Sequence, residues 1–298
     1  MRADLHESRL AWPNARIVCL ALCFIAGLHG TTRRIPRSFK LIGEKLIGKS
    51  WERPQYGVLP IIDGGSTFLG DHVNVTFYNL SVWVLPLVIA ITFHEAAHGL
   101  VAHLFGDNTA WQLGRVSFNP LRHIDPFGTL ILPAILLFAR SPFLFGYAKP
   151  VPVNFRNLNN PKRDMVWVAL AGPVTNILLA LAAASAIHTL TFAPARSAQW
   201  IADNLTNAIV INVMLAVFNM IPIPPLDGGR VAVGLLPRPL ALPLARLEPF
   251  GMMILIGILI LLPLAGSQFG LNLDVISVVL RVLTGYVIQV VLLLTGNA

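Results

Sequence analysis

Two histidines and a glutamate stand close together in one apolar segment, as His94-Glu95-Ala96-Ala97-His98. In a helix, side chains four positions apart lie on the same face, so both imidazoles can reach a single Zn²⁺ ion. Glu95 lies on the adjoining face, where its carboxylate can take a proton from metal-bound water. Ionisable groups are costly inside a membrane and mark functional sites there. The spacing therefore favours a zinc site with a general base over a polar cluster that only joins helices.

A catalytic zinc ion usually takes three protein ligands, so a third must come from elsewhere in the chain. The best candidate is Asp227, an acid at the end of another apolar segment, next to prolines and two glycines in the run Pro222-Ile223-Pro224-Pro225-Leu226-Asp227-Gly228-Gly229. Proline and glycine let the backbone leave helical geometry, which can aim the carboxylate back toward the histidines. A simple acid in a helix-terminal turn is the alternative for this position.

Other polar residues near the apolar segments are weaker candidates. His103 lies five residues after His98, about 140° round a helix, which favours a place at the membrane interface over a role as ligand. His123 and Asp125 stand in a turn flanked by prolines, where local hydrogen bonds are the expected role. His188 lies near a helix end and is expected to face lipid headgroups.

The composition indicates which kind of chain must position these residues. Of 298 residues, 22 are Lys or Arg and 14 are Asp or Glu, so only 12% are charged, against about 25% in soluble domains. Hydrophobic residues make up 55%, the mean hydropathy is +0.68, and there are two Cys. This excludes a disordered or disulfide-stapled chain. The sequence predicts an all-α polytopic membrane protein.

The formal net charge of +8 does not indicate nucleic-acid binding. Seven basic residues fall between Arg33 and Arg53 and seven between Arg115 and Arg163, beside apolar segments and not in the aromatic–basic interleaving that stacks bases. Lys and Arg in such places set membrane topology and meet anionic lipid. We expect the lipid bilayer, and no nucleic acid, among the partners.

The apolar segments predict a bundle of about five to six transmembrane segments. They cover residues 79–105, 128–145, 164–193, 204–222, 249–266 and 275–295. Residues 128–145 are interrupted by Pro133 and Pro142 and followed by Gly146, which suits a re-entrant element.

Three motifs in this chain resemble, in the same order, the signatures of the site-2 protease family, the intramembrane zinc metalloproteases of class M50. They are His94-Glu95-x-x-His98, Ala171-Gly172-Pro173-Val174-Thr175-Asn176 and Asn219-x-x-Pro222-x-Pro224-Pro225-Leu226-Asp227-Gly228-Gly229. The similarity runs from about residue 77 to 265, and its stretches at 114–120 and 148–154 are similar to the small bacterial members without PDZ or CBS domains.

The resemblance implies a role for each matching residue. His94, His98 and Asp227 would bind one Zn²⁺ ion per chain. Glu95 would be the catalytic base, and Asn176 would help to hold the substrate or the oxyanion.

Zinc geometry also constrains how the segments cross the membrane. If residues 128–145 span, the helices that carry His94 and Asp227 run antiparallel and place these residues about 20 Å apart in depth, whereas zinc bonds are about 2 Å long. If residues 128–145 re-enter instead, the two helices run parallel and the ligands meet near one face. The loop 114–163 is then cytoplasmic, and the basic residues before position 77 fall outside, against the charge rule.

The sequence therefore predicts an intramembrane zinc metalloprotease of a bacterial plasma membrane, multi-pass, with its active site near the cytoplasmic face. The expected substrate is a transmembrane protein, cut in or near the bilayer after local unwinding, as in regulated intramembrane proteolysis. The re-entrant element and residues 148–154 are candidates to pair with the unwound strand. The alternative is a non-proteolytic metal-binding transporter or scaffold, which would keep its function after Glu95→Gln.

We expect two regions along the chain. Residues 1–76 form an N-terminal basic arm with a short apolar segment and no assigned function, and residues 77–298 form the membrane-embedded metalloprotease domain.

Overall fold

The computed structural model describes residues 69–131, 134–135, 148–258, 262–269 and 275–297. The N-terminal arm lies almost entirely outside these residues, and so does most of 128–145. The function of the arm and the re-entrant nature of 128–145 therefore stay predictions.

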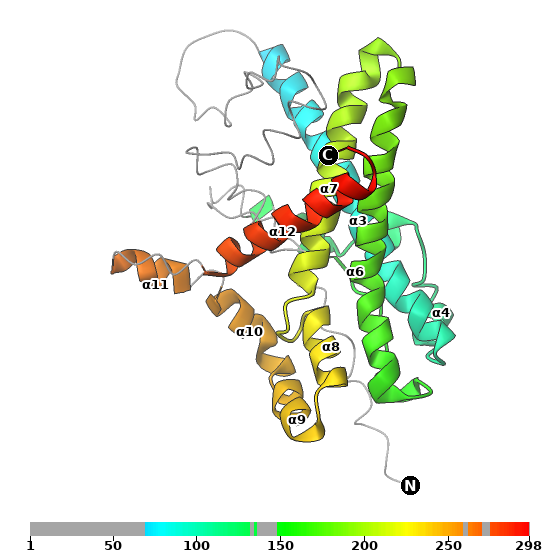
Figure 1. The fold of residues 1–298 in the computed structure, drawn as a ribbon, viewed down its shortest axis with the longest axis vertical. Helices are drawn as coiled ribbons and strands as arrows, with labels where there is room; N and C mark the ends of the chain where they lie inside the picture. Colours follow the sequence, from blue (N-terminus) through cyan, green and yellow to red (C-terminus); the bar gives the residue numbers. More distant parts are fainter. Residues whose placement is uncertain (1–68, 132–133, 136–147, 259–261, 270–274, 298) are drawn as a thin grey trace.

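Every regular element in the described part of the chain is helical (Figure 1). Three helices are long, namely α3 (Leu69–Leu104), α6 (Pro161–Ala186) and α7 (Ala195–Asn219). The shorter α-helices are α4 (Thr109–Gln112), α8 (Asp227–Leu235), α9 (Arg238–Arg246), α10 (Gly251–Ile256), α11 (Leu262–Gln268) and α12 (Val275–Leu294). Short pieces of 3-10 or π-helix form η2 (Pro120–His123), η3 (Pro126–Ile131), η4 (Phe155–Asn157), η5 (Ile187–Phe192) and η6 (Glu248–Phe250).

Three described stretches are long and apolar enough to cross a membrane. They are Phe77–Leu104, Pro161–Phe192 and Ala195–Asn219, and Val278–Leu294 is a shorter apolar helix. This confirms the predicted class of an all-α polytopic membrane protein.

The helices at the predicted spans 79–105 and 204–222 start earlier than expected, and a further predicted span is not one continuous helix in the described residues. Helix α7 begins at Ala195 rather than at 204, because the polar side chains of its first turns find partners. The Asp203 carboxylate accepts hydrogen bonds from the Tyr78 hydroxyl at 2.5 Å and from the Gln199 amide at 2.9 Å. The predicted span 249–266 is described as α10 and the first part of α11, with residues 259–261 between them outside the description.

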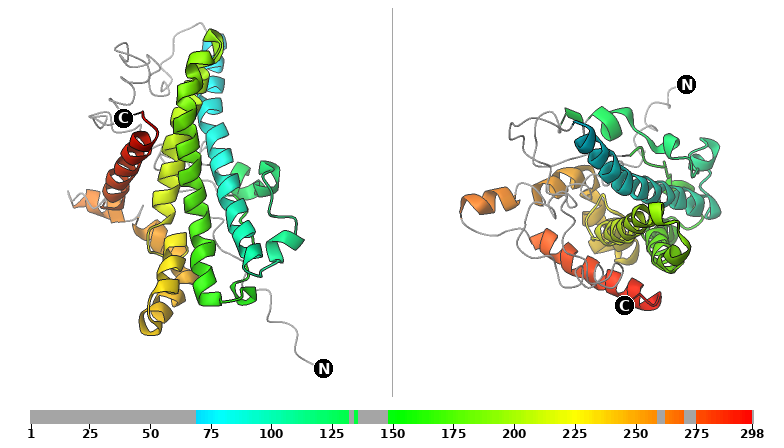
Figure 2. Two further views of the ribbon diagram at one scale, coloured as in Figure 1. Left: turned by 45° about the vertical axis from the view of Figure 1, so that its right-hand side comes forward. Right: turned by 90° about the horizontal axis from the view of Figure 1, so that it is seen from above.

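Helix α6 is the centre of the bundle and packs against α3, α7 and α8. Helices α3 and α7 run in the same direction, and α6 runs in the opposite direction (Figures 1 and 2). The C-terminal half of α3 and the end of α7 therefore lie toward the same end of the molecule. This is the parallel arrangement that the zinc geometry required of the helices that carry His94 and lead to Asp227.

Small residues let these helices approach closely. Ala180, Ala183 and Ala184 of α6 are buried against Ile209 and Val213 of α7, and α12 adds residues to the same cluster. Close packing at small side chains is a main source of helix association in membranes. The α6–α7 pair is thus a firm support for the site at the other end of both helices.

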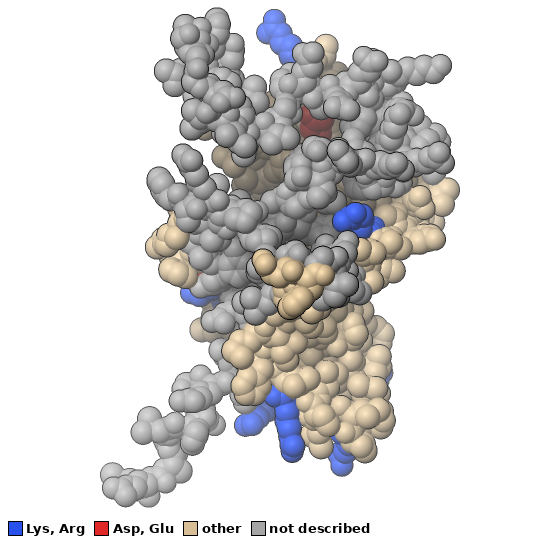
Figure 3. Space-filling model, turned by 90° about the vertical axis from the view of Figure 1, so that its left-hand side faces the viewer, with Lys and Arg blue, Asp and Glu red and all other residues tan. Residues whose placement is uncertain are grey.

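On the face that Figure 3 shows, charged side chains are sparse among the described residues, and several of the basic ones lie toward one end of the molecule. This is the end at which α6 begins and at which α8 and α9 lie (Figure 1). These helices carry exposed Lys162, Arg163, Arg238 and Arg246.

Candidate metal centre

Helix α3 presents His94 and His98 on one face, as their spacing predicts. Both side chains are buried, with 7% and 2% of their residue surface exposed. Their rings lie edge to face at 4.6 Å between centroids, and their Nε2 atoms are 3.0 Å apart. Two imidazole nitrogens thus face the same point in the interior.

Asp227, the first residue of α8, completes this group. One oxygen of its carboxylate, Oδ2, lies 3.2 Å from Nε2 of His94 and 3.3 Å from Nε2 of His98. The side chain is 1% exposed. Among the described residues, these three form the cluster of His, Cys, Asp and Glu side chains that could hold a metal ion.

Glycines make the approach of Asp227 possible. A Cβ atom on Gly228 would lie 2.3 Å from the carbonyl oxygen of Met220, and one on Gly229 would lie 2.4 Å from the backbone nitrogen of Pro224. Real Cβ atoms do not approach this closely, so only glycine lets α8 fold against the turn that follows α7. The tight turn aims the carboxylate of Asp227 at the histidines.

Helix α6 orients both imidazoles from behind. Nδ1 of His94 donates to Oδ1 of Asn176 at 2.5 Å, and Nδ1 of His98 donates to the carbonyl oxygen of Val168 at 2.6 Å. Because these oxygens can only accept, each Nδ1 carries the ring hydrogen and each Nε2 presents a lone pair. Metal-binding histidines in proteins are commonly oriented by such second hydrogen bonds.

Gly172 lets α6 come close enough to do this. A Cβ atom at this position would lie 2.4 Å from Nε2 of His98 and 2.6 Å from Nε2 of His94. The absence of a side chain therefore leaves room beside the two nitrogen atoms.

The geometry of these donors fits zinc. Bonds of about 2.0–2.1 Å in a tetrahedral site separate two ligand atoms by about 3.3 Å, and the three donor atoms here are 3.0–3.3 Å apart. The other carboxylate oxygen of Asp227, Oδ1, is buried without a hydrogen-bond partner among the described residues. A carboxylate binds a metal in its anionic form.

Glu95 lies next to this group on α3 and is also buried, with 6% of its surface exposed. Its Oε2 accepts a hydrogen bond from the backbone N–H of Val151 at 3.0 Å. Val151 belongs to the stretch 148–154, so this extended segment passes directly beside the glutamate.

The amide of Asn176 makes its hydrogen bonds to other residues of the protein. Its Nδ2 donates to the carbonyl oxygen of Ala90 at 3.2 Å and to Oδ1 of Asn212 at 2.8 Å, while its Oδ1 accepts from His94. The side chain is completely buried. This geometry favours a role in orienting His94 over the predicted contact with a substrate or oxyanion.

The structure places the weaker candidates in local contacts outside the metal group. His103 stacks on Trp111, and His123 is buried and donates to the carbonyl oxygen of Ser117. The other contacts join Asp125 to the N–H of Gly128 and His188 to the carbonyl oxygen of Thr295.

Several residues that shape the site were not assigned a role from the sequence. The carbonyl of Val168 and the N–H of Val151 leave no trace in the sequence, because every residue except proline has both groups. Asn212 does carry a signal, since it is a buried polar residue in an apolar segment. Gly172 was part of a motif, but its close approach to the imidazoles needs the packed structure to be seen.

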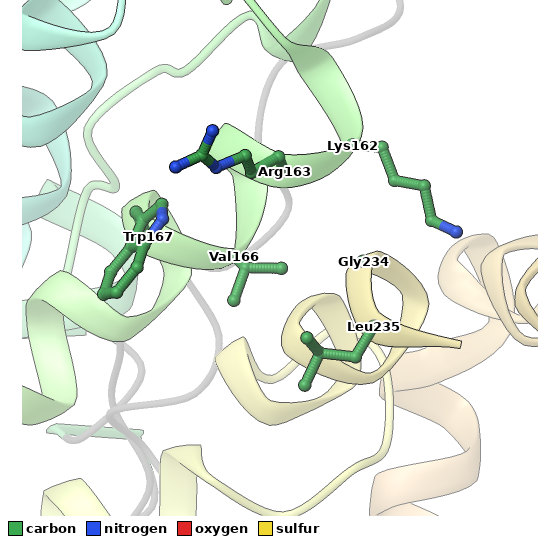
Figure 4. Close-up of a pocket in the computed structure, with 6 residues that line it drawn as sticks. All are labelled: Lys162, Arg163, Val166, Trp167, Gly234 and Leu235. Carbon is green, nitrogen blue, oxygen red and sulfur yellow. The ribbon is translucent and has the colours of Figure 1, made fainter. Parts of the chain in front are cut away.

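A surface pocket of about 400 Å³ lies between the start of α6 and the end of α8 (Figure 4). It contains none of the predicted site residues. Its lining consists of Lys162, Arg163, Val166, Trp167, Gly234 and Leu235.

Comparison with known proteins identifies the family of the chain. The model of peptidase family M50 matches residues 183–262, which include Asp227. No solved structure matches the chain.

Curated relatives match longer regions of the chain than this family model does. YwhC of Bacillus subtilis is 36% identical over 188 residues, which is 60% of this chain and 81% of the relative. Rip2 of Mycolicibacterium smegmatis is 27% identical over 53% of this chain and 57% of the relative, and MJ0611 of Methanocaldococcus jannaschii is 32% identical over 52% of this chain and 72% of the relative. All three bear the name "Putative zinc metalloprotease". Because of these matches, we conclude that the chain belongs to peptidase family M50, the site-2 protease family, and is a zinc metalloprotease of the membrane.

Proposed function

We propose that this metalloprotease cuts peptide bonds within or near the transmembrane segments of other membrane proteins, as in regulated intramembrane proteolysis. One observation carries the proposal, namely the place of the metal group. His94 and His98 are buried inside Phe77–Leu104, a stretch that can span a membrane, and Asp227 follows directly after another, Ala195–Asn219. A site built from such segments is expected to act on chains that are themselves in the bilayer.

In this proposal His94, His98 and Asp227 hold the zinc ion, and Glu95 is the general base. Bound zinc lowers the pKa of a coordinated water toward 7 and polarises the scissile carbonyl. Glu95 takes the proton of the attacking water and delivers it to the leaving amine. Asn176 acts on His94 by fixing its ring hydrogen on Nδ1, so that Nε2 faces the metal.

The segment beside Glu95 has the features of a docking edge for an unwound substrate. A helical substrate hides its carbonyl groups in backbone hydrogen bonds and must unwind before it is cut. Successive backbone groups of an extended chain point to opposite edges, and Pro150 and Pro152 leave one edge without two of its N–H donors. The N–H of Val151 is bonded to Glu95, so this stretch lies beside the site. We propose that the substrate pairs with other backbone groups of residues 148–154.

The charge distribution supports an active site near the cytoplasmic face of the plasma membrane. Arg115 donates to the carbonyl of Lys149, so the stretches 114–120 and 148–154 lie together. Exposed Lys162 and Arg163 follow at the start of α6. Basic residues next to spans are enriched on the cytoplasmic side. The same proposal treats residues 77–298 as the metalloprotease domain.

The proposal is tested with the full chain in liposomes, together with a substrate that spans the bilayer once. Mass spectrometry of the products locates the cut. We expect cleavage within or next to the apolar span, loss of cleavage with a zinc chelator, and recovery when zinc is returned. Cleavage confined to soluble loops, at the same rate in a soluble peptide of that loop sequence, would contradict intramembrane action.

A further inference from the structure

Residues 149–154, here called the strap, form a segment without regular secondary structure along the C-terminal half of α3. Val151 and Val153 are buried, with 1% and 3% exposed, while Pro152 between them is half-buried. Gly99, directly after His98, makes room for the strap, because a Cβ atom there would lie 2.8 Å from Cγ1 of Val151. The strap thus lies against the part of the helix that carries the metal ligands.

The strap also supplies the hydrogen bond to the proposed general base. The N–H of Val151 reaches Oε2 of Glu95 at 3.0 Å, and both residues are buried. A carboxylate that accepts a bond from a fixed backbone donor has its direction set by that donor. The position of the strap therefore decides where Glu95 points.

Arg115 holds the strap immediately before Val151. Its Nη2 donates to the carbonyl oxygen of Lys149 at 2.9 Å and to that of Pro150 at 3.1 Å. Burial lowers the pKa of the Arg115 guanidinium, and the negative charge of Glu95 acts in the opposite direction.

Asp107 holds the other end of the strap. Its carboxylate is fully buried, and Oδ2 accepts the backbone N–H of Asn154 at 2.6 Å. Oδ1 accepts from Thr109 and from the side-chain amide of Asn157. Asp107 comes three residues after the end of α3, so this carboxylate ties the strap to the helix that carries the metal ligands.

We propose that Arg115 and Asp107 are positioning residues for the reaction, because they hold the strap at both ends and so direct the N–H of Val151 onto Glu95. This inference rests on the proposed role of Glu95 as general base. Neither residue is a metal ligand and neither needs to touch the substrate. A displacement of about 1 Å at a reacting group can lower a rate about 100-fold, so loss of either anchor reduces turnover more than it reduces binding.

The first test compares Arg115→Met with Arg115→Lys in the full-length enzyme, with a single-span substrate. We expect kcat to fall about 30- to 100-fold in Arg115→Met, while KM changes less than about threefold and the zinc content stays at one ion per chain. Arg115→Lys recovers part of kcat, because an ammonium group still donates to backbone carbonyls. Arg196→Met is the matched control, since Arg196 is exposed in the first turn of α7, about 35 Å along the helix from its other end, and this variant keeps full activity.

The second test uses Asp107→Asn alone and together with Arg115→Met. If both residues act through one strap, the loss in the double variant is smaller than the product of the two single losses. Full kcat in Arg115→Met, losses that multiply, or a raised KM with normal kcat would each overturn the inference. If Arg115→Met does not fold, Arg115→Lys and Asp107→Asn replace it in the same comparison.

Glu95→Gln separates this inference from the proposed function. If Glu95→Gln still cuts, the proposed role of Glu95 fails and the inference falls with it. If Glu95→Gln is inactive while the Arg115 and Asp107 variants turn over normally, the proposed function stands and only the positioning role is wrong.

Discussion

At the scale of single residues, hydrogen bonds from the far side of each imidazole orient the two histidines toward the carboxylate of Asp227. Asn176 and the carbonyl of Val168 each take the ring hydrogen of one imidazole. The nitrogen atoms that face Asp227 therefore present lone pairs in a buried setting, where a cation can bind to them. The ligand set thus depends on α6, although α6 contributes no ligand.

This dependence predicts the effect of Asn176→Ala. Without the amide oxygen, the ring of His94 is free to turn and to carry its hydrogen on either nitrogen. We expect the affinity for zinc to fall about 10- to 100-fold, as for other outer-shell partners, with activity recovering in excess zinc. A titration against a competing chelator measures this. Asn204→Ala is the control, because Asn204 bonds to the carbonyl of Trp200 within α7; equal affinities in the two variants would contradict the orienting role.

The same residues show how far the sequence alone reaches. The spacing of His94 and His98 on one helix face, and the glycines beside Asp227, were sufficient to predict a group that the structure brings together. The direction of the Asn176 amide was not predictable, because it depends on Ala90 and Asn212 on two other helices. Backbone partners such as Val151 have no sequence signal at all.

At the scale of elements, α6 sets the space in which the imidazoles stand. It packs against α3, α7 and α8. It can approach α3 closely because Gly172 has no side chain. A helix that is positioned this closely transmits any added volume directly to His94 and His98.

Gly172→Ala tests this arrangement. The added Cβ would lie 2.4–2.6 Å from ring atoms of His98 and His94, so either α6 or the imidazoles must shift. We expect less than about half of the zinc to be retained and activity to fall by at least about 100-fold, with helical content unchanged by circular dichroism. The control is Gly285→Ala in α12, where nothing lies within 4 Å of the added atom. A Gly172→Ala enzyme with normal zinc content and activity would show that the close approach is unimportant.

Helix boundaries were predictable where apolar character changes abruptly and not where polar residues find partners. The early start of α7 depends on Asp203 meeting Tyr78 of another helix, which no local pattern reveals. The parallel course of α3 and α7 was predictable because zinc bonds are too short for any other arrangement.

At the scale of the whole molecule, the site lies toward one end of a bundle whose long helices cross from end to end. The stretch Pro161–Phe192 runs from the basic end, where Lys162 and Arg163 are exposed, to the opposite end. The stretches 114–120 and 148–154 lie together, because Arg115 bonds to Lys149 and Pro150, and the second stretch leads through η4 to the start of α6.

This arrangement predicts which positions share a side of the membrane. Single cysteines at Gln112 and Arg156 should react with an impermeant reagent from one side, and a cysteine at Arg196 from the other. The natural Cys19 and Cys23 are first replaced by serine. Labelling of positions 112 and 156 from opposite sides would contradict the topology, and with it the re-entrant interpretation of 128–145.

The most direct test of the central claim is the cleavage of a single-span substrate in liposomes by the wild-type chain, by Glu95→Gln and by Asp227→Ala, with the zinc content of each measured in parallel. A general base and a metal ligand fail in different ways. We predict that Glu95→Gln keeps one zinc ion per chain and loses cleavage by at least about 100-fold, whereas Asp227→Ala loses both zinc and cleavage. Cleavage at the wild-type rate by Glu95→Gln, with zinc bound, would contradict the account.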